Sequence, residues 1–418
     1  MTLKPRAEQK IQELLHKGVF IPNPPTIDIG DEVRTDQISA RDVSIYPGCR
    51  IYGDKTVISA GCRLGYEAPA TIENCRLGAG VELKGGFFSH SVFLEKASMG
   101  MGAHVREGCI LEEEANGAHC VGLKQTILFP FVTLGSLVNF CDGLMAGGTS
   151  RQNHSEVGSS YIHFNFTPDA DKTTASLIGD VPRGVMLNQP PIFLGGQGGI
   201  VGPVRLGFGA VVAAGSILRK DYPEDNLLIF APAPPGSVRP FTPAAYPHFR
   251  RIVENNLLYL ANLKALEAWY AQVRKPFLES LEFGGSLYAG VVEQLASARK
   301  ERLKRLRAMA EKAADPALAE GKPETAAAGQ AWIEHLESIE GVFGAGDPGE
   351  ATQRFRDAFI GDFEKIIGKD RIPYIEAIRS LPPEVAAKGV SWLKSLVNDL
   401  CETTSRTVTS LNLFKQSI

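Results

Sequence analysis

The stretch from residue 194 to residue 218 repeats every six residues. One aliphatic residue marks each repeat, with glycines between them: Leu194, Ile200, Leu206, Val212 and Leu218. A helix has a period of about 3.6 residues and a strand a period of about two, so neither explains this spacing. The period is typical of a parallel β-helix built from hexapeptides, in which the marked residue points inward and stacks on its counterpart one coil away. The sequence therefore predicts a β-helix.

The same frame begins much earlier in the chain and is interrupted in its middle. At first the frame is marked by six positions, each six residues after the last: Ile27, Val33, Ser39, Ile45, Ile51 and Val57. The frame slips near Cys62 and Leu64 and returns through Leu77 and Leu83. It is irregular from about residue 85 to 126. Insertions into a coil form loops at its corners, where repeat proteins place their binding loops, so we expect loops at these interruptions.

Composition divides the chain into three parts. Residues 1–26 carry Ile11, Leu14 and Val19 at helical spacing, which predicts an N-terminal helical cap. Residues 27–240 form the predicted β-helix with inserted loops. Only 12 of the 43 glycines lie beyond residue 247, and residues 241–418 are predicted to form a C-terminal helical bundle. Its expected helices are residues 249–273, 287–314, 324–342, 351–367 and 383–413.

Charge and cysteine content narrow the class of protein. The net charge of −3 at pH 7 argues against nucleic acid or an acidic membrane surface as the main partner. No apolar run approaches the roughly 18 residues that a membrane span needs, and the first residues lack the apolar core of a secretion signal, so we expect a cytoplasmic protein. The seven cysteines form no C-x-x-C pair, so we expect reduced core residues and no metal site.

Polar residues gather between residues 137 and 172, where the repeat is most interrupted. They are Asn139, Asp142, Arg151, Asn153, His154, His163, Asn165 and Lys172. A coil of three hexapeptides has about 18 residues, so Asn139 and Asp142 are expected to face the region of His154 and His163 one coil on. Histidine and carboxylate side chains are common general bases. The alternatives are a turn role for Asp142 and ordinary loop hydrogen bonds for the histidines.

A basic run, R-K-E-R-L-K-R-L-R from Arg299 to Arg307, lies in the expected bundle. Leu295, Leu303 and Leu306 have helical spacing around it, which predicts an amphipathic helix with a basic outer face. A solvated helix face is the interpretation that we favour, and contact with an anionic partner is the alternative.

Three segments resemble a known family. They are I-H-F-N-F-T-P-D-A-D-K (Ile162–Lys172), L-I-G-D-V (Leu177–Val181) and the last coils, from Ile192 to Asp221. Together they resemble the left-handed β-helix acetyltransferase domain of bifunctional N-acetylglucosamine-1-phosphate uridyltransferases, over roughly a fifth of the chain. The glycine-rich G-x-G-T-R-M signature of a nucleotidyltransferase does not occur, so uridyltransferase activity is not expected.

The resemblance has implications for fold, assembly and ligands. It implies a left-handed parallel β-helix, a homotrimer with sites between subunits, and acyl-coenzyme A, most simply acetyl-coenzyme A, as co-substrate. By position, Asn165 and Phe166 would contact acyl-coenzyme A or the sugar. Gly196 and Ala214 would line the pantetheine groove, and Lys172 would meet a sugar phosphate.

The chain departs from the family's pattern at two places. The family's general base is a histidine, and a gap-free count back from Asn165 reaches Asp142. A carboxylate serves as this base only when its pKa is raised, so His154 or His163 is the alternative. Residues 182–190 form an insertion close to the expected cofactor groove. We therefore expect His154 and Asp142 as catalytic residues, and the expected substrate-binding residues are Asn139, Arg151, His163 and Lys172.

Two interpretations of function follow. In the first, the protein transfers an acyl group from coenzyme A to an amine or hydroxyl of a sugar phosphate or nucleotide sugar. A base removes the proton, and backbone N–H groups stabilise the oxyanion. In the second, a non-catalytic protein that has lost the family's histidine binds a nucleotide sugar or serves as a scaffold. A zinc enzyme is not expected, because the histidines show no close pair that would converge on a metal ion.

Overall fold

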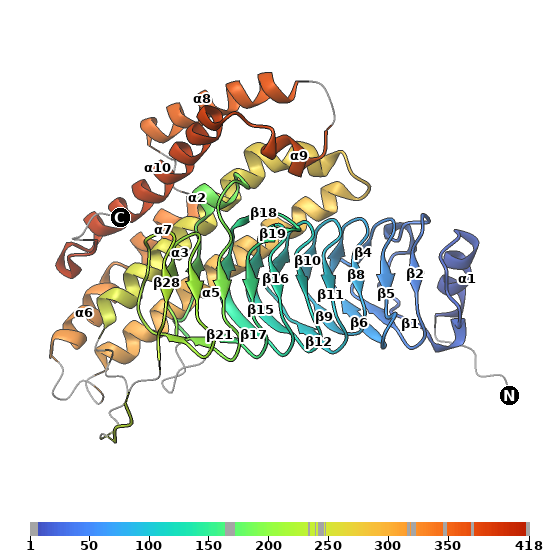
Figure 1. Cartoon of the computed structure of the whole chain (residues 1–418), viewed down its shortest axis with the longest axis horizontal. Helices are drawn as coiled ribbons and strands as arrows, with labels where there is room; N and C mark the ends of the chain where they lie inside the picture. Colours follow the sequence, from blue (N-terminus) through green and yellow to red (C-terminus); the bar gives the residue numbers. More distant parts are fainter. Residues whose placement is uncertain are drawn as a thin grey trace.

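The computed structural model describes residues 7–163, 172–232, 235–238, 240, 246, 248–315, 318, 323–345, 349–368 and 372–414. The chain forms a parallel β-solenoid followed by a helical region (Figure 1). The predicted parallel β-helix with appended helices is therefore confirmed. Among the described residues, no helix is both long enough and apolar enough to span a membrane.

A short helix covers the first coil of the solenoid. Helix α1 (Glu8–His16) buries Ile11 and Leu14 against the coil, and the 3-10 turn η1 (Pro24–Thr26) follows it. Lys10 Nζ donates hydrogen bonds to three carbonyl oxygens of residues 30–33, at 2.6–2.9 Å. A second 3-10 turn, η2 (Thr35–Gln37), completes this end. The helix thus covers the open end of the core.

Each coil of the solenoid has three faces, which the chain visits in the order 1, 2, 3. Face 1 contains β1 (Asp28–Ile29), β3 (Arg50–Tyr52), β6 (Ala70–Glu73), β9 (Gly86–Ser89), β12 (Ala103–Val105), the first parts of β15 (Gly122–Leu128) and β17 (Asn139–Met145), β21 (Ile162–His163), β24 (Gly199–Ile200) and β27 (Ile217–Leu218). Face 2 contains β4 (Val57–Ile58), β7 (Arg76–Leu77), β10 (Ser91–Phe93), β13 (Cys109–Leu111), the last parts of β15 and β17, β22 (Ser176–Ile178) and β25 (Arg205–Leu206).

Face 3 is a ten-stranded sheet along the whole solenoid. Its strands are β2 (Ser44–Ile45), β5 (Arg63–Leu64), β8 (Glu82–Leu83), β11 (Ser98–Met99), β14 (Asn116–Gly117), β16 (Thr133–Leu134), β20 (Glu156–Val157), β23 (Phe193–Leu194), β26 (Val211–Val212) and β28 (Leu228–Ile229). We name the corners by the faces they join: corner 1–2, corner 2–3 and corner 3–1.

The six-residue frame sets the core. Leu194 pairs in parallel with Val212, and Ile200 pairs with Leu218, eighteen residues on in both cases. The marked residues from 194 to 218 are all buried. Each such aliphatic side chain contributes about 1.5–3 kcal/mol by burial, so the stacked columns make the solenoid stable.

Two insertions leave the solenoid at corner 2–3. The first is an antiparallel hairpin of β18 (Gly148–Ser150) and β19 (Asn153–His154). The second, at residues 182–190, begins in α2 (Val181–Gly184), where Asp180 accepts a hydrogen bond from Arg183 N at 2.9 Å. Helix α2 packs against α3 (Phe249–Trp269) and α10 (Pro383–Thr407), and the Val181 N–H donates to Asn262 Oδ1 at 2.9 Å. The second insertion thus joins the solenoid to the helices.

The helical region matches the expected pattern in its long helices. After α3 come a π-helical turn η3 (Tyr270–Arg274), α4 (Lys275–Glu279), α5 (Gly284–Ala314), α6 (Pro323–Glu334), α7 (Leu336–Ala345), α8 (Glu350–Ile367), α9 (Tyr374–Arg379), α10 and a last 3-10 turn η4 (Thr409–Leu411). The pattern at residues 324–342 forms two helices rather than one. Helix α9 was not predicted, because its six residues are too few to show a period.

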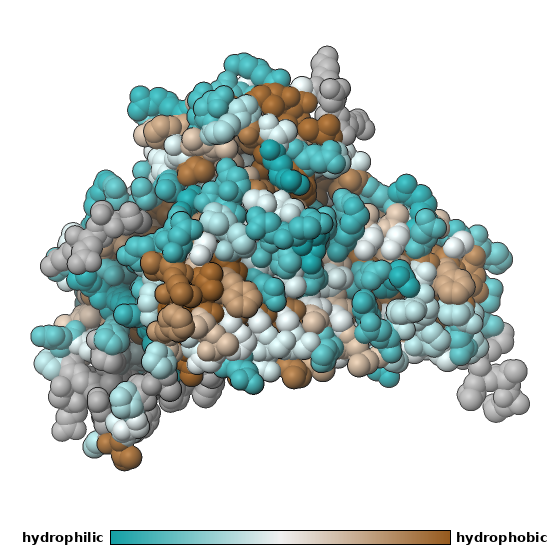
Figure 2. All heavy atoms as spheres, in the orientation of Figure 1, coloured by the Kyte–Doolittle hydropathy of each residue, from teal (hydrophilic) through white to brown (hydrophobic). Residues whose placement is uncertain are grey.

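The long helices cover face 2 of the solenoid. Helices α3 and α5 pack on face 2, and Figure 1 shows that the solenoid beside α1 has no helices over it. Rings of Trp269, Phe359 and Trp392 stack where α3, α8 and α10 meet, with centroids 5.7 and 5.9 Å apart along the stack. On face 3, Phe193, Val211 and Leu228 are neighbours on paired strands and exposed. Figure 2 shows an apolar patch over this end of the solenoid.

Candidate functional site

Asp142 lies at corner 1–2, where an arginine of the helical region binds its carboxylate. Its φ of 55° is left-handed, its side chain is buried, and Arg302 Nη2 of α5 donates to its Oδ1 at 2.6 Å. Arg302 Nη1 donates to the backbone carbonyl of Lys172 at 3.0 Å. Burial raises the pKa of Asp142, while the charge of Arg302 opposes the shift. The structure therefore brings Asp142 and Lys172 together, with an arginine between them.

His163 lies inside the solenoid next to the same corner. It pairs with Phe140 of the neighbouring coil, and Ile162 is the residue that faces outward. His163 Nε2 is 2.8 Å from Ser176 Oγ, and Nδ1 contacts the carbonyl oxygen of Cys141. Burial lowers the pKa of His163 to about 4. The ring is therefore neutral near pH 7 and faces the core.

Arg151 and His154 belong to the hairpin at corner 2–3. Arg151 Nη1 donates to the carbonyl oxygens of Glu114 (3.1 Å) and Phe131 (2.8 Å) and to Thr133 Oγ1 (3.1 Å). His154 Nδ1 is 2.8 Å from the Arg151 carbonyl oxygen. The arginine therefore anchors the hairpin to the coils beneath it, and the hairpin orients the histidine.

The remaining predicted residues lie elsewhere. Asn139 is exposed on face 1, where it lines a shallow cavity of about 380 Å³ with His104, Arg106 and Cys120. Gly196 and Ala214 lie at corner 3–1, in neighbouring coils. Asn165 and Phe166 lie outside the described residues. The predicted residues thus divide among three corners and one face.

The prediction of a basic outer face on α5 is wrong for one residue. Arg302 is 2% exposed and points into the solenoid. It is seven residues after Leu295 and four before Leu306, both buried, so its spacing places it on the apolar face of the helix. The other arginines pair with acidic side chains, among them Arg307 with Glu340 at 2.9 Å.

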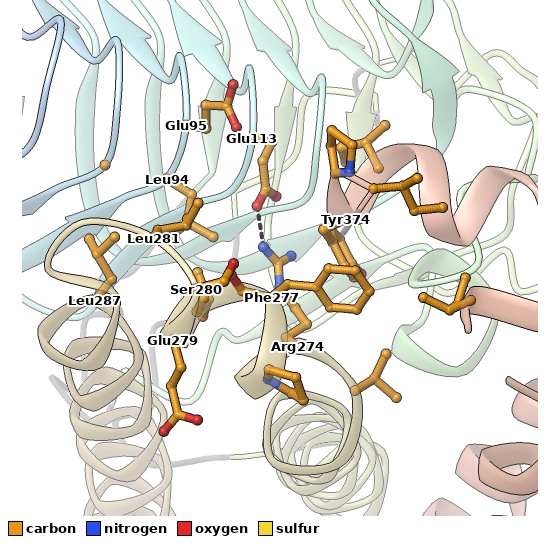
Figure 3. A pocket seen from close by; sticks show the side chains of 18 of the residues that line it. Leu94, Glu95, Glu113, Arg274, Phe277, Glu279, Ser280, Leu281, Leu287 and Tyr374 are labelled. Carbon is orange, nitrogen blue, oxygen red and sulfur yellow. Dashed lines mark hydrogen bonds and ion pairs between the residues drawn. The ribbon is translucent and has the colours of Figure 1, made fainter. Parts of the chain in front are cut away.

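A second buried charged group lies at corner 2–3, and the sequence analysis did not identify it. Arg274 of η3 donates from Nη2 to Oε1 of Glu113 (Figure 3). Its Nη1 lies 3.3 Å from Oε1 of Glu112. The hydroxyl of Tyr270 donates to the same Glu112 oxygen at 2.5 Å. The guanidinium carbon lies 3.9 Å from the ring centroid of Tyr374 and 4.7 Å from that of Tyr270. Aromatic faces and carboxylates thus hold one cation inside the protein.

The two carboxylates of this group have different surroundings. Burial raises the pKa of Glu112 to about 7; the charge of Glu113 adds to the shift, and that of Arg274 opposes it. A carboxyl group with a pKa near neutrality is typical of functional sites. The only signal in the sequence is three consecutive glutamates, Glu112 to Glu114, directly after a buried strand.

Two adjoining cavities run along corner 2–3 beside this group. The larger, of about 760 Å³, is lined by the corner and by α4, α8 and the residues around α9. The smaller, of about 390 Å³, contains Arg151 of the hairpin. Glu95 and Glu113 line both cavities, so Arg151 and the buried group lie along one groove. Among the described residues, no group of three or more histidine, cysteine and acidic side chains is arranged to hold a metal ion.

Comparison with known proteins identifies relatives of about half the chain. No protein-family model matches it. The protein named Bifunctional protein GlmU of Thermotoga maritima is 30% identical over 220 residues, which are 52% of this chain and 44% of that protein. GlmU of Carboxydothermus hydrogenoformans is 29% identical, with coverages of 53% and 44%. GlmU of Acinetobacter baumannii is 29% identical, with coverages of 53% and 43%. The chain therefore spans less than half the length of these relatives.

These similarities confirm the resemblance to the hexapeptide-repeat acetyltransferase part of GlmU. A solved structure of UDP-N-acetylglucosamine O-acyltransferase (LpxA) from Moraxella catarrhalis is 14% identical, covers 48% of this chain and 67% of that one, and has a TM-score of 0.24. At this TM-score the likeness supports no conclusion about this chain.

Proposed function

We propose that the protein is an acyltransferase that moves an acyl group, acetyl in the simplest case, from coenzyme A to an amine or hydroxyl of a sugar phosphate or nucleotide sugar. The similarity to GlmU over half of the chain is the observation that carries the proposal. Gly196 and Ala214 at corner 3–1, with Asn165 and Phe166, contact the coenzyme in this scheme, and the base comes from a neighbouring subunit, because His154 lies at corner 2–3 of its own chain. The protein acts as a homotrimer with its sites between subunits.

His154 is the general base in this proposal. A carbonyl oxygen only accepts, so the contact with the Arg151 carbonyl assigns the proton to Nδ1. In the neutral ring the lone pair is then on Nε2, which lies 3.9 Å from a carboxylate oxygen of Glu156. The side chain is 21% exposed, so a substrate can approach it. A fixed tautomer with an accessible Nε2 is suited to removing a proton near neutral pH.

Asp142 is the weaker candidate. Its carboxylate is held by Arg302, and taking a proton from a substrate would require α5 to release it. His163 is neutral and faces the core, so it is a positioning residue for the backbone of Cys141 in this proposal.

The second candidate function is non-catalytic binding of a nucleotide sugar. The observation in its favour is the ion pair between Arg302 and Asp142. Asp142 is the residue that a gap-free count aligns with the family's general base. Its carboxylate is buried beneath α5.

Coenzyme A release by the full chain tests the first function. Acetyl-coenzyme A would be supplied with a panel of amino-sugar phosphates and nucleotide sugars, and free coenzyme A measured by chromatography. We expect turnover with at least one acceptor, and a loss of about 100-fold or more in kcat for His154→Gln. His16→Gln is the matched control, because His16 is exposed in α1 at the far end of the solenoid.

Thermal-shift measurements separate the two functions. A stabilisation by nucleotide sugars without any response to an acyl-coenzyme A would favour binding alone. Turnover that is unchanged in His154→Gln would show that the base lies elsewhere. Absence of both turnover and coenzyme binding would refute the acyltransferase proposal.

A further inference from the structure

The larger cavity at corner 2–3 has no part in the proposed acyl transfer. Its walls come from the solenoid on one side and from the helical region on the other (Figure 3). Apolar side chains form much of them, among them Leu94, Phe277, Leu281, Leu287 and Phe363. Its volume of about 760 Å³ is within the usual range for small-molecule sites. The helices thus create a space that a β-solenoid alone does not have.

Glu113 lines this cavity, and one of its two carboxylate oxygens has no hydrogen-bond partner in the described part of the chain. Its Oε1 accepts from Arg274, and its Oε2 is buried with no hydrogen-bond partner among the described residues. Glu113 is only 8% exposed and lines the cavity. An unpaired buried carboxylate oxygen costs free energy, which a donor inside the cavity would recover.

Carboxylates outnumber basic side chains on the described lining of the cavity. The buried group has two carboxylates, Glu112 and Glu113, for one guanidinium, Arg274. The other carboxylates that line the cavity are Glu95, Glu279 and Glu364, and Arg274 is the only basic residue on the described lining. Glu95 pairs with Lys96 at 2.9 Å and Glu279 with Lys275 at 3.8 Å, whereas Glu364 has no ion pair among the described residues. A cation entering this space is attracted by the surplus of carboxylates, and an anion is repelled.

We propose that this cavity binds a small organic cation, a primary ammonium group joined to an apolar body of about eight carbon atoms. The ammonium group donates to Oε2 of Glu113, which is fully buried and has to turn toward the cavity to accept the bond. The apolar body packs against Leu94, Phe277 and Leu287. This site is independent of acyl transfer, and its test requires no enzymatic activity.

Three probes of equal length test the charge preference. The full chain would be titrated by calorimetry at pH 7 with octylamine, octanol and octanoate. We expect octylamine to bind about tenfold more tightly than octanol, and octanoate to bind more weakly than octanol. Equal affinities for the three probes, or tighter binding of octanoate, would overturn the proposal.

Two substitutions test the location of the site. Glu113→Gln keeps an oxygen for Arg274 and removes the charge, so the affinity for octylamine should fall to that for octanol. Binding of octanol should be retained, which shows that the variant is folded. Glu376→Gln, in the neighbouring cavity only, is the matched control and should change neither affinity by more than about twofold. A preference for octylamine that persists in Glu113→Gln would refute the proposal.

Leu281→Trp provides a second test that does not disturb the buried charges. Leu281 lines the cavity and is 44% exposed, so a larger side chain is tolerated there. The indole would occupy space that the apolar body needs, and both octylamine and octanol should bind about tenfold more weakly. Unchanged affinities would show that the probes bind elsewhere.

Discussion

Arg302 and Arg274 both reach from the helical region to buried carboxylates of the solenoid, yet their surroundings differ. Arg302 meets one carboxylate, Asp142, at 2.6 Å. Arg274 meets two, Glu112 and Glu113. Among the described residues, every buried side-chain polar atom of Arg302 and Asp142 has a hydrogen-bond partner, whereas Nε and Nη1 of Arg274 and Oε2 of Glu113 have none.

The ratio of charges explains the difference. A one-to-one pair whose hydrogen bonds are all made has no free donor or acceptor for a ligand. The pair of Arg302 and Asp142 therefore only holds α5 on the solenoid, and we call it the clasp. A two-to-one group has surplus negative charge once Glu112 is ionised, together with unpaired donor and acceptor atoms, and the Arg274 group lies beside a cavity. Helices that dock on a solenoid can thus close one corner and build a site at another.

Breaking the clasp should have the largest effect on stability. In Arg302→Met the carboxylate of Asp142 stays buried without its partner, and removal of one member of a buried pair costs about 3–5 kcal/mol. Urea denaturation at pH 7, followed by circular dichroism, should show a loss of this size. The double variant Arg302→Met/Asp142→Asn should recover most of it, because neither charge remains.

An exposed arginine of the same helix is the control for this experiment. Arg307 pairs with Glu340 at 2.9 Å, and both side chains are more than a third exposed. Such pairs contribute about 0–1 kcal/mol, so Arg307→Met should have little effect. Equal losses for Arg302→Met and Arg307→Met would show that the buried pair is not a clasp.

The solenoid could be predicted because its signal is local. The six-residue spacing from Leu194 to Leu218 is read directly from neighbouring residues, and all the marked positions are buried. The slip near residue 62 is equally local: Leu64 pairs with Leu83 nineteen residues on, and Leu83 with Met99 sixteen residues on. Corner residues are added or removed while the inward column continues, so the frame changes and the fold does not.

The contacts between helices and solenoid could not be predicted in the same way. Arg302 and its carboxylate are 160 residues apart, and their meeting depends on how α5 docks on face 2. Spacing with Leu295 and Leu306 indicates that Arg302 lies on the apolar face, but no local pattern names its partner. Nothing local in the sequence links Arg274 to Glu112, because a charged side chain does not show which distant residue it will contact.

Acid conditions should weaken the region around the clasp through His163. Burial lowers the pKa of His163 to about 4 from an ordinary value of 6.5. The folded state then binds fewer protons than the unfolded state between these values, so stability falls as the pH falls through this window. The linked loss between pH 7 and pH 5 is about 2 kcal/mol.

His163→Gln should remove most of this acid-side loss. The amide can still bond to Ser176, and it takes up no proton. Urea denaturation at pH 5, 6 and 7 would measure the slope, with the exposed His16→Gln as the matched control. A slope that persists in His163→Gln would assign the acid sensitivity to other groups.

The Arg274 group should show a smaller pH effect of opposite sign. Burial raises the pKa of Glu112 to about 7 from an ordinary value of 4.5, with the charge of Glu113 adding to it and that of Arg274 opposing it. The folded state then binds more protons between these values. This contribution to stability is fully present below about pH 4.5 and is lost as the pH rises through 7. The loss between pH 6 and pH 8 is about 1 kcal/mol.

Glu112→Gln tests whether the surplus charge of the two-to-one group is real. The amide oxygen can still accept from Tyr270, and the remaining charges become one-to-one, as at Arg302. The variant should lose the slope between pH 6 and pH 8 and be at least as stable as the wild type at pH 8. Glu376→Gln, an exposed carboxyl of α9, should keep the wild-type slope. If Glu112→Gln were destabilised at pH 8 as strongly as Arg302→Met, both carboxylates would be needed to hold Arg274, and the contrast between clasp and site would fail.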